Sequence, residues 1–282
     1  DTLTVIDSSS GTIISTVTGF NIAQTVGGDR AVAASPDGSY ALVIENGAKR
    51  VSRYDVSGNL VWSIDRDTQA ADISTEGYAY ILTTRGLIYG DTLLWVAAVD
   101  GAILGEFDFG GFDLVLDEEH SGLWLAGEHI ERLSLDLESQ FALDPIEWCA
   151  VSVDYTSDGS AWVAERAHPD VPGSGDNLLK ITATGEVAQI VELDFSPACL
   201  SVDRSDDSVW VVGGDVLRKV DRDGSFLLEI DSGSAFTVRV DQQHGSVWVA
   251  GRTGTVRRYS RDGDQLLSLP GFSSDQAYVA VP

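Results

Sequence analysis

The chain has 282 residues, of which 43% are hydrophobic and 22% are charged, so it can bury a large core and is not a disordered chain. Its 18 Lys and Arg against 44 Asp and Glu give a net charge of −26, which excludes the basic surface that nucleic-acid and polybasic membrane-surface binders need. No apolar run approaches the roughly 18–20 residues of a membrane span, and two cysteines exclude a disulfide framework or a four-cysteine zinc site. We therefore expect neither a nucleic-acid partner nor membrane insertion.

The first residues suggest where the protein works. The sequence contains no Met and begins with Asp1, which is typical of a mature form whose leader has been removed. We therefore expect a protein that is secreted, periplasmic or on the cell surface.

The chain opens with two short β-rich segments, residues 3–7 and 11–17, which we interpret as the third and outer strands of a four-stranded unit. A repeat follows. Two weaker copies lie at residues 33–42 and 71–81, and four clear copies begin at Val115, Ser152, Ser201 and Arg239. In the clear copies, a segment ending in Asp is followed by a turn and a strand such as Ser-Val-Trp-Val-Ala.

One aromatic residue marks each copy, and successive markers are 38 to 48 residues apart. The markers are Tyr40, Tyr80, Trp124, Trp162, Trp210 and Trp248. This period fits one four-stranded β-propeller blade, and the segments alternate with period two rather than with a helical period. We expect the aromatic side chains to pack between blades.

Within each copy, short turns separate the strands. Turns such as Ser57-Gly58-Asn59, Asp223-Gly224 and Asp262-Gly263 carry the Gly and Asp residues that a hairpin needs. The last segment, residues 277–281, looks like an inner strand. Joined to the first two strands it would form a composite blade closed by both termini. The prediction is a single all-β propeller over residues 1–282, with seven blades, or six as the alternative count, and with this composite blade.

The Val-Asp and Gly-Ser-Val-Trp-Val-Ala pattern resembles the NHL-repeat and streptogramin-lyase-like group of β-propellers. The opening Leu3-Thr4-Val5-Ile6-Asp7 segment is similar to the YVTN-type repeats of surface-layer and envelope propellers. The resemblance covers nearly the whole chain and implies the propeller fold. It also implies lyases, lactonases or binding scaffolds as functions, and a lyase of this group would carry paired catalytic histidines, whereas this chain has no His-x-His spacing.

The strongest cluster of chemical groups is an insertion between the second and third strands of the fourth blade, residues 165–177. Such a loop lies on a propeller rim, where binding residues gather. Its candidate ligand-binding residues are Glu165, Arg166, His168, Asp170 and Asp176, and Glu165 and His168 are weak catalytic candidates. The alternative interpretation is a solvated surface insertion.

Other candidate metal ligands are few. His120 and His244 occupy comparable turns, which favours a solvated turn role over a ligand role. The segments 221–224 and 262–264 resemble fragments of a calcium loop, but both stand where a hairpin turn is required. No cofactor is predicted, calcium is possible, and no metal ligand is assigned.

The two cysteines begin inner strands of adjacent blades. Cys149 lies five residues before Asp154, and Cys199 lies four before Asp203. A disulfide between Cys149 and Cys199 and a pair of buried thiols are equally compatible with this placement.

A regular repeat with few catalytic groups favours a non-enzymatic binding or assembly scaffold whose rim loops face a protein or glycan partner. The first alternative is a metal-assisted hydrolase, lactonase or lyase with a site at the rim. The second is a structural subunit of a surface layer or extracellular filament, for which self-association is possible.

Overall fold

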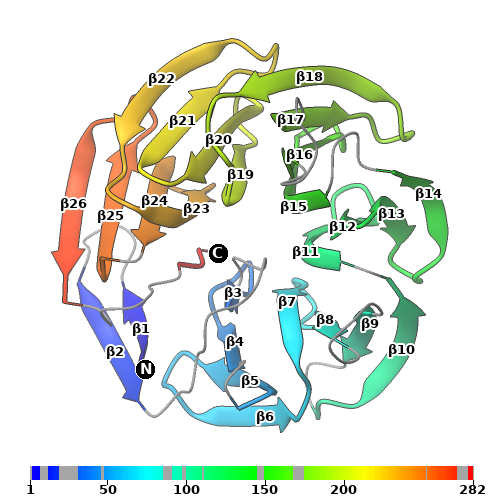
Figure 1. The fold of residues 1–282 in the computed structure, drawn as a ribbon. Coiled ribbons are helices and arrows are strands. Elements are labelled where there is room, and N and C mark those ends of the chain that lie inside the picture. The colour runs from blue at the N-terminus through cyan, green and yellow to red at the C-terminus, as the bar shows by residue number, and fades with distance from the viewer. Residues whose placement is uncertain are drawn as a thin grey trace.

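The computed structural model describes residues 2–6, 12–18, 31–45, 48–84, 91–96, 100–109, 111–144, 149–167, 175–251, 253–271 and 279–281. These residues form β-strands joined by turns. They include no helix that is long and apolar enough to cross a membrane. Figure 1 shows the strands arranged as a ring of radial sheets around a centre.

The described strands form six four-stranded antiparallel sheets and one two-stranded sheet. We number the four-stranded sheets in chain order. The first sheet contains β3 (Val32–Ala34), β4 (Tyr40–Glu45), β5 (Arg50–Asp55) and β6 (Leu60–Ile64). The second contains β7 (Thr68–Ile73), β8 (Ala79–Thr84), β9 (Asp91–Val96) and β10 (Ile103–Asp108). The third contains β11 (Gly111–Asp117), β12 (Gly122–Gly127), β13 (Ile130–Ser134) and β14 (Ser139–Leu143).

The remaining three sheets repeat the same order of strands. The fourth contains β15 (Cys149–Tyr155), β16 (Ala161–Arg166), β17 (Asp176–Ile181) and β18 (Val187–Leu193). The fifth contains β19 (Cys199–Asp203), β20 (Ser208–Gly213), β21 (Val216–Val220) and β22 (Phe226–Asp231). The sixth contains β23 (Ala235–Asp241), β24 (Ser246–Gly251), β25 (Thr255–Ser260) and β26 (Gln265–Pro270).

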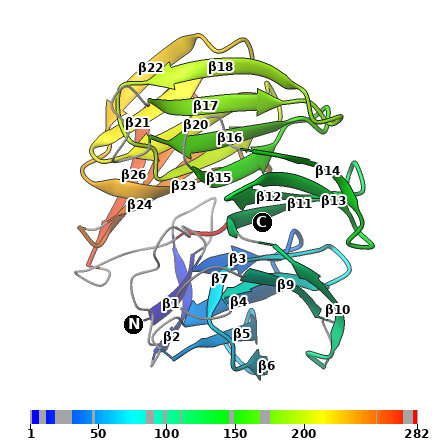
Figure 2. The same ribbon diagram turned by 45° about the vertical axis from the view of Figure 1, so that its right-hand side comes forward.

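Burial falls from the inside of each sheet to its outside. In the third, fifth and sixth sheets every residue of the second strand is buried, whereas β10, β22 and β26 alternate exposed and half-buried residues. Apolar clusters lie between consecutive sheets. Figure 2 shows these sheets turned by 45° from the view of Figure 1. The predicted packing of the marker aromatics is confirmed, since Trp124, Trp162 and Trp210 are fully buried.

Side-chain hydrogen bonds connect the innermost strands of neighbouring sheets. In each bond a polar side chain of one inner strand accepts a backbone N–H of the next, which supplements the apolar packing. The pairs are Asp72 Oδ2 with Leu116 N at 3.0 Å, Asp113 Oδ2 with Val153 N at 3.0 Å, Asp154 Oδ2 with Val202 N at 2.9 Å, and Ser201 Oγ with Val240 N at 3.1 Å.

The structure corrects the alignment of one repeat unit. Asp154 was expected to match Asp203, but Asp154 pairs directly with Trp162, whereas Asp203 pairs with Ser208, two residues before Trp210. The inner strand β15 also shifts register between Ala150 and Ser152. Asp154 therefore connects two sheets instead of beginning the turn.

The predicted blade count is also wrong. Both counts, seven and six, came with a composite blade closed by strands from the two ends of the chain. In the structure β1 (Thr2–Ile6) and β2 (Ile13–Thr18) form a sheet of two strands, and among the described strands they pair with each other alone. Residues 279–281, the described part of the expected last strand, are not in a strand. Val279 and Val281 instead pack against the buried cluster of Trp248, Ala250 and Val256. Figure 1 shows the C-terminus near the centre of the ring.

Candidate functional site

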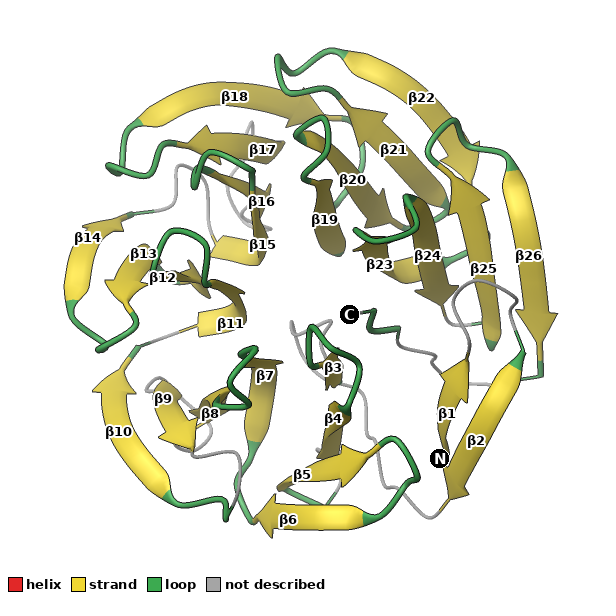
Figure 3. Cartoon of the chain, turned by 180° about the vertical axis from the view of Figure 1, so that it is seen from behind, coloured by secondary structure: helices red, strands yellow, loops and turns green. Residues whose placement is uncertain are grey.

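In the part of the chain that the structure describes, tight turns make up one rim of the ring. In an antiparallel meander the turn after the first strand and the turn after the third strand lie at the same end of the sheet. The inner strands of neighbouring sheets run in the same direction, so these turns gather on one face of the molecule. We call this face the turn rim. Figure 3 shows the turns as loops between the strands.

Asp side chains shape these turns from within. Asp221 Oδ1 accepts the N–H groups of Asp223 at 2.9 Å and Ser225 at 2.7 Å. Gly224 then takes a φ of +82°, which a residue without a side chain adopts at little cost. The predicted hairpin turn at this position is confirmed, and the fragment that resembles a calcium loop uses its first carboxylate to hold the turn.

Asp-His pairs recur at two equivalent turns. His120 Nδ1 lies 2.8 Å from Asp117 Oδ1, and His244 Nδ1 lies 3.0 Å from Asp241 Oδ2. Each Asp ends an inner strand and is buried, whereas the His side chains are 30% and 35% exposed. The predicted equivalence of the two histidines is confirmed, and each ring is oriented by the carboxylate beside it.

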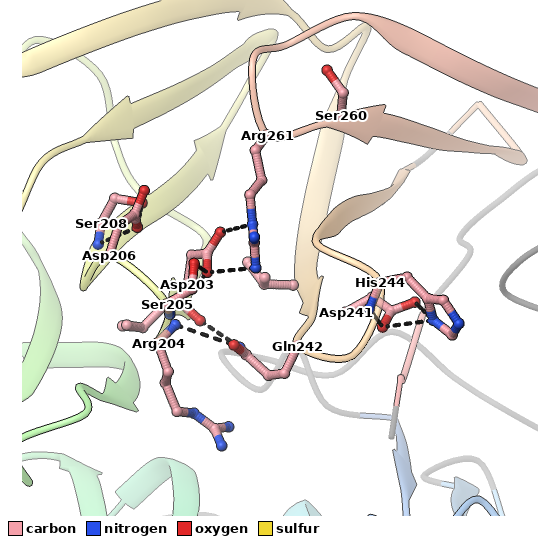
Figure 4. Close-up of polar contacts among 12 residues, drawn as sticks. Asp203, Arg204, Ser205, Asp206, Ser208, Asp241, Gln242, His244, Ser260 and Arg261 are labelled. Atoms are coloured by element: carbon pink, nitrogen blue, oxygen red, sulfur yellow. Dashed lines mark hydrogen bonds and ion pairs between the residues drawn. The ribbon is translucent and has the colours of Figure 1, made fainter.

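The turns of the fifth and sixth sheets are bonded to one another (Figure 4). Arg261 forms an ion pair with the fully buried Asp203, with Nε 2.5 Å from Oδ2. Gln242 accepts the backbone N–H of Arg204 at 3.1 Å and donates to Val202 O at 2.7 Å. These contacts fix the two turns relative to each other, so this part of the turn rim is rigid.

Carboxylates dominate the exposed side chains of the turn rim. Its described turns expose twelve of them, namely Asp37, Glu76, Asp100, Glu119, Asp136, Glu138, Asp158, Glu186, Asp206, Asp223, Asp262 and Asp264. Among the described residues of these turns, Arg222 is the one exposed Lys or Arg. The turn rim is therefore a strongly anionic face, and its field attracts cationic groups.

The predicted insertion site lies on the opposite rim, and the structure describes only part of it. His168 and Asp170 lie outside the described residues. Glu165 is fully buried in β16, Arg166 Nε donates to Pro197 O at 2.8 Å, and Asp176 Oδ1 accepts Ala167 N at 3.1 Å. The structure thus places Arg166 and Asp176 in contacts that hold the base of the insertion.

The cysteines lie on adjacent inner strands but at different heights. Ser152 Oγ accepts Leu200 N at 3.2 Å, which places residue 152 beside residue 200, so Cys199 lies about two residues along the axis from Cys149. Both thiols are buried, and they are not bonded to each other. Arg239 Nη1 donates to Cys199 Sγ at 2.9 Å.

Within the described ranges, no group of three or more His, Cys, Asp or Glu side chains is arranged to hold a metal ion. Calcium binding stays a prediction from the sequence.

Sequence reasoning missed a cation that accompanies the buried tryptophans. The third strand of four sheets places a Lys or Arg directly across from the marker Trp of the second strand. Each cationic group lies 5.5–5.7 Å from the indole centroid, within range of a cation-π interaction. The pairs are Arg132 with Trp124, Lys180 with Trp162, Lys219 with Trp210 and Arg258 with Trp248. The signal was available as a Lys or Arg 8 to 18 residues after each Trp.

Comparison with known proteins identifies the architecture alone. No protein-family model matches the chain, and no curated protein matches it. A solved structure of a protein of unknown function from Desulfotomaculum acetoxidans has a TM-score of 0.71 and 12% identity, covering 100% of this chain and 96% of that one.

Two further solved structures are similar over most of their length. Hydrazine synthase from Kuenenia stuttgartiensis has a TM-score of 0.71 and 13% identity, covering 89% of this chain and 86% of that one. KlHsv2 with loop 6CD replaced by a Gly-Ser linker has a TM-score of 0.64 and 13% identity, covering 88% and 83%. The protein has a β-propeller fold.

Proposed function

We propose that the protein is a non-enzymatic binding scaffold whose turn rim docks a basic segment of a protein partner. The observation that carries this proposal is the charge of the turn rim, with twelve exposed carboxylates against the single exposed Arg222 in its described turns. Such a face speeds the approach of a cationic partner and repels anionic ones. Of the two partner classes expected from the sequence, a protein and a glycan, the charge favours a protein that carries a basic segment.

The rigidity of the turn rim supports the same function. Neighbouring turns are bonded to each other, as in Thr75 N with Glu118 Oε2 at 2.9 Å and Ser157 N with Asp207 Oδ1 at 2.7 Å. A surface whose backbone is already fixed loses little conformational entropy when a partner binds. The proposal includes membership of the NHL-repeat and YVTN-type groups of β-propellers and a location outside the cytoplasm. Binding modules are among the members of these groups.

The probe is a peptide of about a dozen residues that is rich in lysine and arginine. Its binding to the protein is measured by fluorescence anisotropy. In a variant with Asp136→Asn, Glu138→Gln, Asp262→Asn and Asp264→Asn, we expect the affinity for the peptide to fall about tenfold at low salt. The matched control neutralises Asp65, Glu106, Glu128 and Glu192, which are exposed away from the turn rim.

Both variants change the net charge by the same amount. Comparing them therefore separates the effect of the turn-rim charges on peptide binding from the effect of the overall net charge. Wild-type binding should weaken steeply between about 50 and about 300 mM NaCl. Equal loss in the two variants, or no binding of the peptide by the wild-type protein, would overturn the proposal.

A further inference from the structure

A pocket opens on the turn rim between the first and second sheets. It has a volume of about 300 Å³ and is bounded by the turn after β3, by β5 and β6, and by the turn after β7. Pockets that bind small molecules begin at about this volume. A basic segment can dock on a charged face without a cavity. The proposed docking function therefore does not account for this pocket.

A buried guanidinium forms one wall of the pocket. Arg53 on β5 is 2% exposed, and its Cζ lies 3.5 Å from the centroid of the Tyr40 ring. Arg53 Nη1 donates to Gly77 O of the second sheet at 3.2 Å. Burial lowers the pKa of Arg53, but an Arg stays charged at neutral pH. The pocket therefore contains a positive charge held in one orientation.

Two carboxylates flank the pocket, one from each sheet. Asp37 and Glu76 line it and are both exposed. Hydrogen bonds from Ser35 and Ser39 lower the pKa of Asp37 to about 2, and the Ser35 Oγ to Asp37 Oδ1 distance is 2.6 Å. Asp37 is thus anionic at neutral pH.

The pocket also has an apolar wall. Val61, on the outermost strand of the first sheet, lines it and is 40% exposed. A ligand that fits this arrangement has an anionic group for the guanidinium, a cationic group for the carboxylates, and a small apolar group for Val61.

We propose that this pocket binds a free α-amino acid with a small apolar side chain. The ligand's carboxylate contacts the Arg53 guanidinium, and its ammonium group lies between Asp37 and Glu76. A simple carboxylate would be repelled by Asp37 and Glu76, and a simple amine has no group that contacts Arg53, so a molecule with both charges is the one that is attracted by every wall.

Isothermal titration calorimetry with L-valine, propionate, propylamine and glucose tests the proposal on the full chain. We expect L-valine to bind and each of the other three to bind at least tenfold more weakly. Glucose is included because carboxylates and an Arg also bind sugar hydroxyls. Propionate or glucose binding as tightly as valine, or no binding of valine at millimolar concentration, would overturn the proposal.

Variants locate the site. Asp37→Asn with Glu76→Gln changes exposed residues and should abolish valine binding, and Arg53→Lys should weaken it because the planar fork is lost. The control, Asp65→Asn with Glu128→Gln, removes the same charge at exposed residues away from the turn rim and should leave valine binding unchanged. Should Arg53→Lys fail to fold, the Asp37 and Glu76 double variant still decides, with its fold checked by circular dichroism.

The two proposals fail separately. Valine binding without peptide binding would reject the docking function and leave the pocket assigned, and the reverse result would reject the pocket alone.

Discussion

At the scale of single residues, the marker tryptophans and their cations hold neighbouring sheets together. The indole rings of Trp124, Trp162 and Trp210 are fully buried, and that of Trp248 is 2% exposed. Their Nε1 atoms have no hydrogen-bond partner among the described residues. The contribution of these residues to stability therefore comes from buried area and from the cation over the ring, rather than from the indole N–H.

This arrangement predicts different costs for two substitutions of Trp210. Trp210→Phe should lower the free energy of unfolding by about 1–2 kcal/mol, because it loses area and cation-π attraction but no hydrogen bond. Trp210→Ala should lower it by about 3–5 kcal/mol, because it leaves a cavity. Urea unfolding of both variants measures the difference. Equal costs would contradict the prediction, because the two variants both lack the indole N–H and differ only in the volume that the new side chain leaves unfilled.

Cys149 shows a second effect at this scale, the coupling of burial to pH. Burial raises the pKa of the Cys149 thiol from 9.0 to about 11, and Glu165 adds to this shift while Arg166 opposes it. The unfolded chain releases the thiol proton at a lower pH than the folded chain. The thiol therefore contributes stability that is fully present below pH 9 and is lost as the pH rises to about 11.

We predict that Cys149→Ala flattens this part of the stability profile. The free energy of unfolding, measured in urea at a series of pH values from about 8 to about 11, should fall less in the variant than in the wild type. Tyrosines that ionise in this range contribute equally to both proteins and cancel. A fall of the same size in both would contradict the prediction.

At the scale of elements, turn chemistry and strand alternation agree with what the sequence predicted. The Gly of the predicted hairpin turns takes a positive φ, +81° at Gly58 and +91° at Gly263. Glycine is also required where two backbones approach. At Gly213, the last residue of β20, an added Cβ would collide with the backbone carbonyl of Ser196, whereas at Gly214 it would meet nothing within 4 Å.

These two adjacent glycines make a matched pair. Gly213→Ala should lower the free energy of unfolding by about 2–4 kcal/mol, because the segment around Ser196 must move. Gly214→Ala should cost only about 1–2 kcal/mol, because its φ of +58° is unfavourable but its surroundings are open. Thermal and urea unfolding of the two variants tests the order. A larger cost at Gly214 would show that the connection before β19 adapts easily.

At the scale of the whole molecule, the excess of negative charge works against the compact ring. With a net charge of −26, carboxylates on neighbouring turns repel one another. Salt screens this repulsion over about 10 Å at 0.1 M. The same field that makes the turn rim attractive to a basic partner therefore lowers stability when the ionic strength is low.

We predict that the melting temperature rises with salt. Raising NaCl from about 20 to about 500 mM should increase it by several degrees. The variant with Asp136, Glu138, Asp262 and Asp264 neutralised should show a smaller increase, because four repelling charges have been removed from one face. A melting temperature independent of salt would show that the rim charges are too far apart to interact.

The sequence by itself determined the repeat, the all-β class, the period of the strands, the hairpin turns and the burial of the marker aromatics. These follow from local rules, since alternation, Gly and Asp act within a few residues of the chain. It did not determine how the ring closes, because pairing between the chain ends depends on contacts between residues far apart in sequence. Composition predicted that the protein would be acidic, but only the tertiary structure gathered the exposed carboxylates onto one rim and placed Arg53 from one sheet beside the turn of the next. Each four-stranded sheet is encoded locally, whereas a site between two sheets exists only once they pack against each other.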